Sequence, residues 1–162
     1  MKRFLMRFFP IRAKSVDEFV DLVRTAGCGT VQITPVERNI GMPGPAGCSL
    51  FVWVPAGNEC IGTERYVLYS ARMPQGREIR HYYGRTVRYE EAGVLRDHVA
   101  HEQDAARVFF EAERQAQWLR RMLPGVVVEE CSITGIPITA ATRREYHRIA
   151  AEYGVTPPTG HV

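Results

Sequence analysis

The sequence predicts an α+β protein: a single mixed sheet that contains an antiparallel meander, with one long helix and two shorter helices packed on it. Two observations support this. Short amphipathic stretches follow capping residues near both ends of the chain, and a longer helical stretch follows a run of strand-like segments separated by Gly and Pro turns. With 162 residues the chain fits one domain, expected over residues 1–154 with a flexible C-terminal tail over 155–162.

The N-terminal part predicts a strand and then a helix. Residues 3–11 are rich in Phe and alternate weakly, which indicates a strand. Ser15 and Glu18 have the spacing of a capping box, in which the serine accepts from the amide three residues on and the glutamate reaches back to the cap amide. We therefore expect a helix over 15–26 that ends at Gly27.

Four further segments predict strands. They cover residues 30–34, 50–54, 64–73 and 78–89. Residues 50–54 are apolar throughout, which indicates a strand covered on both faces. Alternation predicts that Val67, Tyr69 and Ala71 share one face and that Gly84 kinks the last of these strands.

The C-terminal half predicts a long helix, a strand and a last helix. Apolar residues recur at helical spacing over 93–122, with acidic residues near the start and basic residues near the end, as the helix dipole favours. A strand follows from 126 and extends toward 133. Either Thr139 or Thr142 caps the last helix, and the run from Thr142 to Glu145 has the form of a capping box.

Arginine dominates the basic residues. Of the 21 basic residues, Lys2 and Lys14 are the only lysines, which leaves 19 arginines. Codon bias in a GC-rich genome explains such an excess without any function. The alternative is that guanidinium groups are needed, since they bind phosphate or carboxylate in bidentate fashion and stack on bases.

Several classes of protein are disfavoured. No stretch approaches the run of about 18 apolar residues that spans a bilayer, so we expect no integral membrane association. Arg7 and Pro10 interrupt the apolar start, which argues against a signal peptide. The four cysteines form no C-x-x-C pair, so we expect reduced thiols, a cytoplasmic location and no cofactor.

A basic and aromatic hairpin is the first candidate site. Arginines neutralise phosphates and tyrosines stack on unpaired bases, so a strand that interleaves them is typical of a nucleic-acid surface. Alternation places Arg80 and Tyr82 on one face and Tyr83 on the other. The simpler explanation is a solvated hairpin whose tyrosines pack under arginine stems. The predicted nucleic-acid-binding residues are Arg72, Arg77, Arg80, Tyr82, Tyr83, Arg85 and Arg88, with Arg3 and Arg7 from the first strand.

A histidine and glutamate cluster is the second candidate site. His98, His101 and Glu102 share one side of the long helix and could hold a metal ion. The alternative is an ordinary polar face, in which Glu102 sits at the edge of the core with a partner.

These features favour a non-catalytic binding module within a nucleic-acid-handling or phage/mobile-element assembly. Such a module contacts nucleic acid through the hairpin and a protein partner or a second copy through the long helix. Two alternatives stay open. One is a small enzyme, such as a metal-dependent hydrolase, with its site between the meander and the long helix. The other is a structural subunit that oligomerises through that helix, where Trp118 lies off the apolar stripe.

Overall fold

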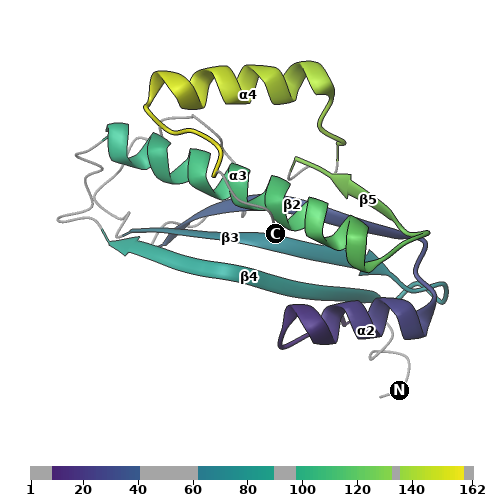
Figure 1. Cartoon of the computed structure of the whole chain (residues 1–162). Helices are drawn as coiled ribbons and strands as arrows, with labels where there is room; N and C mark the ends of the chain where they lie inside the picture. Colours follow the sequence, from purple (N-terminus) through teal and green to yellow (C-terminus); the bar gives the residue numbers. More distant parts are fainter. Residues whose placement is uncertain (1–8, 41–61, 90–97, 133–135, 159–162) are drawn as a thin grey trace.

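A computed structural model describes residues 9–40, 62–89, 98–132 and 136–158 (Figure 1). In these residues five strands form one mixed sheet and three helices pack on it, which confirms the predicted α+β architecture. None of the three helices is both long enough and apolar enough to cross a membrane.

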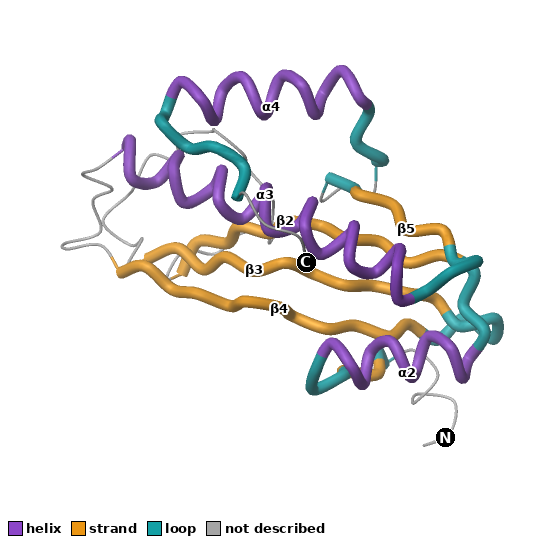
Figure 2. The backbone as a smooth tube through the Cα atoms, viewed as in Figure 1, coloured by secondary structure: helices purple, strands orange, loops and turns teal. Residues whose placement is uncertain are grey.

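The meander forms the centre of the sheet. The strands are β1 (Ile11–Arg12), β2 (Thr30–Ile40), β3 (Gly62–Arg72), β4 (Glu78–Tyr89) and β5 (Val127–Glu130). Their order across the sheet is β1-β4-β3-β2-β5 (Figure 2). β2, β3 and β4 pair antiparallel, whereas β1 joins β4 and β5 joins β2 in parallel.

Strand lengths differ from the prediction at two places. The strand expected over 3–11 comprises only Ile11–Arg12 in the described residues, since Phe9 and Pro10 are not in the ladder and residues 1–8 lie outside the described part. The strand expected over 30–34 continues to Ile40, across Pro35. The Cys131 amide donates to the Ile33 carbonyl, so the backbone of Ile33 faces β5. The backbone nitrogen of Pro35, two residues on, faces the same side, just beyond the last residue pair between β2 and β5. The missing amide hydrogen therefore breaks no ladder bond.

The other strands follow the prediction where they are described. Gly84 has a φ of 64°, and the β3–β4 register shifts beside it, so the expected kink is a β-bulge. The predicted strand over 50–54 lies outside the described residues, as do the first residues of the long helix expected from 93.

The first helix is α2 (Val16–Ala26), as predicted. The Ser15 hydroxyl accepts from the Glu18 amide at 3.0 Å, and Gly27 ends the helix with a φ of 69°. The return half of the capping box differs, because the Glu18 carboxylate accepts from the amide of Lys14 at 2.9 Å, one residue before the cap. Both bonds still satisfy amides at the helix start.

α2 and the long helix α3 (His98–Met122) cover the same face of the sheet. Tyr69 of β3 connects them, because its ring meets Phe19 of α2 edge-on at 5.4 Å and its hydroxyl donates to Gln115 of α3. The predicted shared face of Val67, Tyr69 and Ala71 is confirmed, since all three are buried in this core. The two helices contribute Val20, Val23, Ala112, Ala116 and Leu119 to the same core, and Leu123, the residue after α3, joins them.

The last helix, α4 (Ala140–Glu152), forms an outer layer on α3 (Figure 1). Thr139 is its cap and accepts from the Thr142 amide at 3.1 Å. The alternative capping box from Thr142 to Glu145 is wrong, because both residues lie inside the helix and Glu145 pairs with Arg148.

A second apolar cluster joins α4 to α3. The rings of Phe109 and Tyr146 meet edge-on at 5.1 Å, with Phe110 and Ala150 beside them. Val155, the first residue of the segment expected to be a flexible tail, is buried in this cluster. The chain thus continues to pack on α3 after the end of α4.

Candidate nucleic-acid interface

The face of the sheet opposite α2 and α3 carries part of the predicted interface. Register pairs Arg72 with Glu78 and Ser70 with Arg80, so these side chains share one face with Tyr82. No helix in the described residues packs there. We call it the outer face. Its exposed part is the end formed by β1, the start of β4 and the end of β3.

Arg12 completes this exposed end. The parallel pairing of β1 with β4 places Arg12 beside Arg80. The Arg12 guanidinium carbon lies 4.8 Å from the centre of the Tyr82 ring, within the range of a cation–π contact. The ring of Tyr66, from β3, meets the Tyr82 ring edge-on, with ring centres 5.2 Å apart. The prediction that Arg80 and Tyr82 lie on the opposite face from Tyr83 is therefore confirmed. Arg12 lies on the same face as Arg80 and Tyr82.

Glu78 holds Arg80 in place. Arg80 Nη2 donates to Glu78 Oε2 at 2.9 Å, and the Ser70 hydroxyl also donates to Glu78. Burial disfavours the charged carboxylate, but these two hydrogen bonds and the positive charges of Arg80 and Arg72 together outweigh it, so the pKa of Glu78 is lowered. Among the described side chains at this exposed end of the outer face, Arg12, Arg72 and Arg80 carry three positive charges and Glu78 carries one negative charge, a formal +2.

Tyr83 belongs to the helix-covered face and not to the outer face. Its ring stacks on Tyr69 with centres 6.0 Å apart and planes 16° apart. Burial and then the nearby Glu111 carboxylate raise the pKa of the Tyr83 hydroxyl. The structure therefore separates this residue from the rest of the predicted nucleic-acid set.

The remaining predicted arginines do not all join the patch. Arg77 donates from Nε to the carbonyl oxygen of Phe9 at 3.1 Å, which ties the β3–β4 turn to the segment before β1. Arg85 pairs with the buried Glu64, so its charge is already matched. Arg3 and Arg7, and the side chain of Arg88, lie outside the described residues.

The predicted metal site is only partly described. Glu102 is in α3 with a side chain that is 0% exposed. The side chains of His98 and His101 lie outside the described residues. Among the side chains that the structure does describe, no group of three or more His, Cys, Asp or Glu residues could hold a metal ion.

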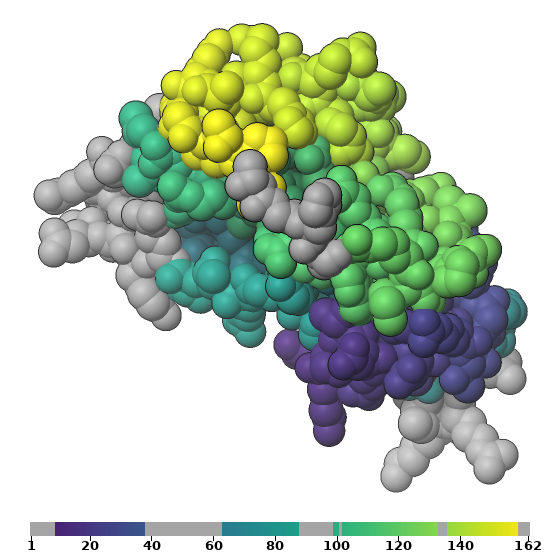
Figure 3. All heavy atoms as spheres, viewed as in Figure 1, coloured from purple at the N-terminus to yellow at the C-terminus, as the bar shows by residue number. Residues whose placement is uncertain are grey.

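A cleft opens between the meander and α3, where the enzyme hypothesis placed its site. Its volume is about 570 Å³, and its floor is the helix-covered face of β3 and β4. Among the described residues α2 covers only one end of β4, and part of β4 beyond α2 is visible at the surface in Figure 3. Glu102 does not line it. The residues that line it are Arg65, Tyr66, Val67, Tyr83, Gly84, Thr86, Val87, Asp104, Arg107, Val108 and Glu111.

One end of this cleft holds a buried arginine. The Arg65 side chain is 3% exposed, and its Nε lies 3.3 Å from the Glu37 carboxylate. Its Nη1 lies 3.8 Å from Asp104, which also accepts from Arg107 at 3.0 Å. Acidic and basic groups thus alternate here, and neither sign dominates the cleft.

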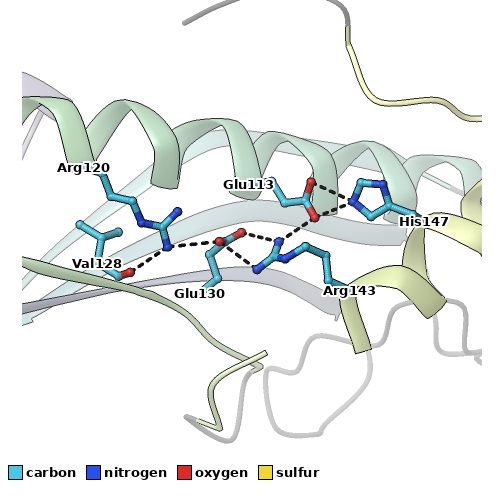
Figure 4. Close-up of polar contacts among 6 residues, drawn as sticks. All are labelled: Glu113, Arg120, Val128, Glu130, Arg143 and His147. Carbon is cyan, nitrogen blue, oxygen red and sulfur yellow. Dashed lines mark hydrogen bonds and ion pairs between the residues drawn. The ribbon is translucent and has the colours of Figure 1, made fainter. Parts of the chain in front are cut away.

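A third polar cluster joins α4, α3 and β5 (Figure 4). Arg143 of α4 donates two hydrogen bonds of 2.9 Å to Glu130 and one of 2.7 Å to Glu113. His147 Nε2 lies 2.8 and 3.0 Å from the two Glu113 oxygens, so this nitrogen carries the hydrogen that is donated. Arg120 donates to Glu130 and to the Val128 carbonyl. Because every member has a partner inside the fold, the cluster acts as a structural clamp on α4.

Sequence reasoning missed Arg12 as a member of the interface. The basic character of the N-terminal segment pointed toward it, but only the parallel β1–β4 pairing brings Arg12 to Tyr82. Trp118, considered for a second contact surface on α3, is half-buried and packs against the main core.

Comparison with models of protein families, with curated proteins and with solved structures finds no match to this chain. The chemistry of the described residues is therefore the basis for a functional proposal.

Proposed function

We propose that the protein is a non-catalytic binding module of a nucleic-acid-handling or phage/mobile-element assembly, and that the outer face binds single-stranded nucleic acid. The supporting observation is the contact of the exposed Arg12 guanidinium with the Tyr82 ring, next to Arg80. The free side of a guanidinium plane that already lies on a ring is a surface on which a base can stack.

The charges of the patch suit this ligand. Arg12, Arg72 and Arg80 lie on one face, and a backbone of phosphates that crosses it meets a net positive charge. Strands present a shallow surface, which suits unpaired bases that stack on rings and guanidinium planes. Cys28 and Cys131 are buried free thiols, in keeping with the reducing cytoplasm in which we place the protein.

Binding of labelled single- and double-stranded oligonucleotides across a salt series tests the proposal. We expect single strands to bind more tightly than duplexes. For each phosphate contact, the logarithm of the association constant should fall by about 0.7 for every tenfold rise in salt concentration. Arg12→Ala is expected to weaken binding by about tenfold, since about 1–3 kcal/mol accompanies the loss of one stacking contact.

Arg144→Ala is the matched control, because Arg144 is exposed on α4, far from the outer face in the layered fold. It is expected to change affinity less than twofold. Tyr82→Phe should retain binding and Tyr82→Leu should lose it, because only the aromatic ring supports the stack. Absence of binding at low ionic strength, or equal loss in Arg12→Ala and Arg144→Ala, would reject the proposal.

A further inference from the structure

A carboxylate lies among the arginines at the exposed end of the outer face. Glu78 pairs in register with Arg72 of β3 and precedes Arg80 by two residues on the same face of β4. The Glu78 side chain is 30% exposed and the Arg80 side chain is 36% exposed, so a ligand reaches both. A negative charge at this place does not help to bind phosphate, so its contribution to binding must be of another kind.

Glu78 is an acceptor of hydrogen bonds at neutral pH. Burial opposes its ionisation, but its two hydrogen bonds and the nearby arginines lower its pKa, so the carboxylate is ionised. An ionised carboxylate accepts and does not donate, and each of its oxygens has two acceptor sites. Oε1 accepts from the Ser70 hydroxyl and Oε2 accepts from Arg80 Nη2 at 2.9 Å. Each oxygen therefore keeps one acceptor site beyond these bonds.

The pair of Glu78 and Arg80 presents its free groups in a defined order. Arg80 has five N–H groups and keeps donors beyond those directed at Glu78 and Tyr82. From the Ser70 side toward Arg80, the order is an acceptor at Oε1, an acceptor at Oε2 and a donor on the guanidinium.

This order is complementary to the pairing edge of guanine. That edge presents N2–H, N1–H and O6, which are two adjacent donors and then an acceptor. Adenine and cytosine each present a single amino donor beside acceptors, and thymine and uracil present one N–H between two carbonyl groups. Proteins read unpaired bases through hydrogen bonds to these edges. Guanine alone among these bases matches both oxygens of a carboxylate.

We infer that the outer face selects guanine in single-stranded nucleic acid, with guanine N1–H and N2–H donating to the Glu78 carboxylate and Arg80 donating to O6. The inference rests on the proposed function and makes Glu78 the specificity-determining residue of that surface.

The charges favour a base over a phosphate at Glu78. A phosphate there would meet a like charge and would have to displace Glu78 from Arg80, and such contacts are costly. A guanine leaves the bond between Glu78 and Arg80 intact and adds to it. The exposed Arg72, opposite Glu78 on β3, remains available to a neighbouring phosphate.

The guanine is distinct from the base that stacks on Arg12. The Arg12 guanidinium lies over Tyr82, and Tyr82 is four residues from Glu78 along β4. At a rise of about 3.3 Å per residue the two places are about 13 Å apart, so two nucleotides of one strand occupy them.

The experiment uses the full chain and short fluorescent oligothymidine strands that carry one central guanine, adenine, cytosine or hypoxanthine. Hypoxanthine lacks only the N2 amino group of guanine. Fluorescence anisotropy at one salt concentration is expected to show binding about tenfold tighter for guanine than for adenine or cytosine, because a bidentate contact is lost with either base. The hypoxanthine strand should bind about threefold more weakly than the guanine strand, since one of the two donors is missing.

Glu78→Gln replaces one of the two acceptors by a donor, so the preference for guanine over adenine should fall below about twofold. Glu129→Gln is the matched control. It removes the same charge from the same face, because Gln32 pairs with both Ser70 and Glu129, but Glu129 lies on β5 at the opposite edge of the sheet. It should retain the preference.

Equal affinity for the guanine, adenine and hypoxanthine strands would overturn the inference and leave the proposed function intact. So would a preference for guanine that Glu78→Gln retains while all strands lose affinity in proportion, since Glu78 would then only hold Arg80 in place. Equal loss of the preference in Glu78→Gln and Glu129→Gln would also overturn it. Absence of binding by every strand at low salt would reject both the inference and the proposed function.

Discussion

Tyr82 and Tyr83 are neighbours in β4, yet they belong to regions with different physical roles. Tyr83 lies under the helical layer, where it stacks on Tyr69 and where burial and Glu111 raise the pKa of its hydroxyl. Tyr82 lies on the outer face, where its contacts are Tyr66 and the guanidinium of Arg12. One residue stabilises the core, and the other is placed to meet a ligand.

The difference shows how one basic and aromatic segment can serve two purposes. A β-strand sends successive side chains to opposite faces, so interleaved residue types are separated as soon as one face is covered. The helix-covered face should therefore govern stability, and the outer face should govern binding. Three measurements test this division, taken from the largest expected effect to the smallest.

Phe19→Ala should have the largest effect on stability. Phe19 is completely buried against Tyr69, and deleting such a ring leaves a cavity that costs about 3–5 kcal/mol in the free energy of unfolding. Tyr82→Ala, the counterpart on the outer face, should cost about 1 kcal/mol or less. Urea unfolding followed by circular dichroism measures both. Equal losses would show that the outer face is a second core and would remove the comparison.

Arg143→Met should have the next largest effect. It removes three hydrogen bonds and leaves the carboxylates of Glu113 and Glu130 without their shared cation, at a cost of about 2–3 kcal/mol for partly buried charges. The control is Arg148→Met on the same helix. Arg148 pairs with Glu145 and Glu152 on the exposed surface of α4, so its loss should cause no measurable change in the same unfolding assay. Equal effects would mean that the clamp does not hold α4.

Tyr69→Phe should cost about 1–2 kcal/mol at neutral pH, because Gln115 loses its donor. Burial, and then the charges of Tyr83 and Glu111, raise the pKa of Tyr69 far above its ordinary value of about 10. Above a pH of about 10 the Tyr69 hydroxyl loses its proton in the unfolded chain but keeps it in the folded chain. The stability of the wild-type protein must therefore fall as pH rises through about 10.

Unfolding measured at neutral pH and above pH 10 should show a smaller alkaline loss in Tyr69→Phe than in the wild-type protein. Tyr83 still contributes to the loss that remains, since its pKa is raised for similar reasons. An identical alkaline loss in both proteins would show that Tyr69 ionises as easily in the fold as in the unfolded chain.

The sequence predicts the helices and the meander well because local signals specify them. Ser15, Gly27 and Thr139 occupy the cap positions that backbone groups at helix ends require, and the predicted boundaries follow from them. Glu18 and Thr142 show the limit of such rules. Each fits a capping box by spacing, but the first binds one residue further back and the second lies inside its helix.

The candidate interface is less predictable, because it depends on pairings between distant segments. Alternation alone separates Arg80 and Tyr82 from Tyr83. It does not reveal that Arg85 is matched by Glu64, that Arg77 holds the carbonyl of Phe9, or that Arg12 lies over Tyr82. Each of these contacts joins residues that are far apart in sequence.

Local sequence thus determined the α+β class, the helix caps, the kink at Gly84 and the two faces of β4, because dihedral preferences and side-chain periodicity act within a few residues. Only the tertiary structure decided that α2 and α3 cover the same face, that β1 ends at Arg12 beside β4, and that a cleft remains beyond α2. Those features depend on strand order and on how far each helix reaches across the sheet. No local preference encodes either of them, so the distribution of the arginines between core, clamp and surface became visible only in the folded chain.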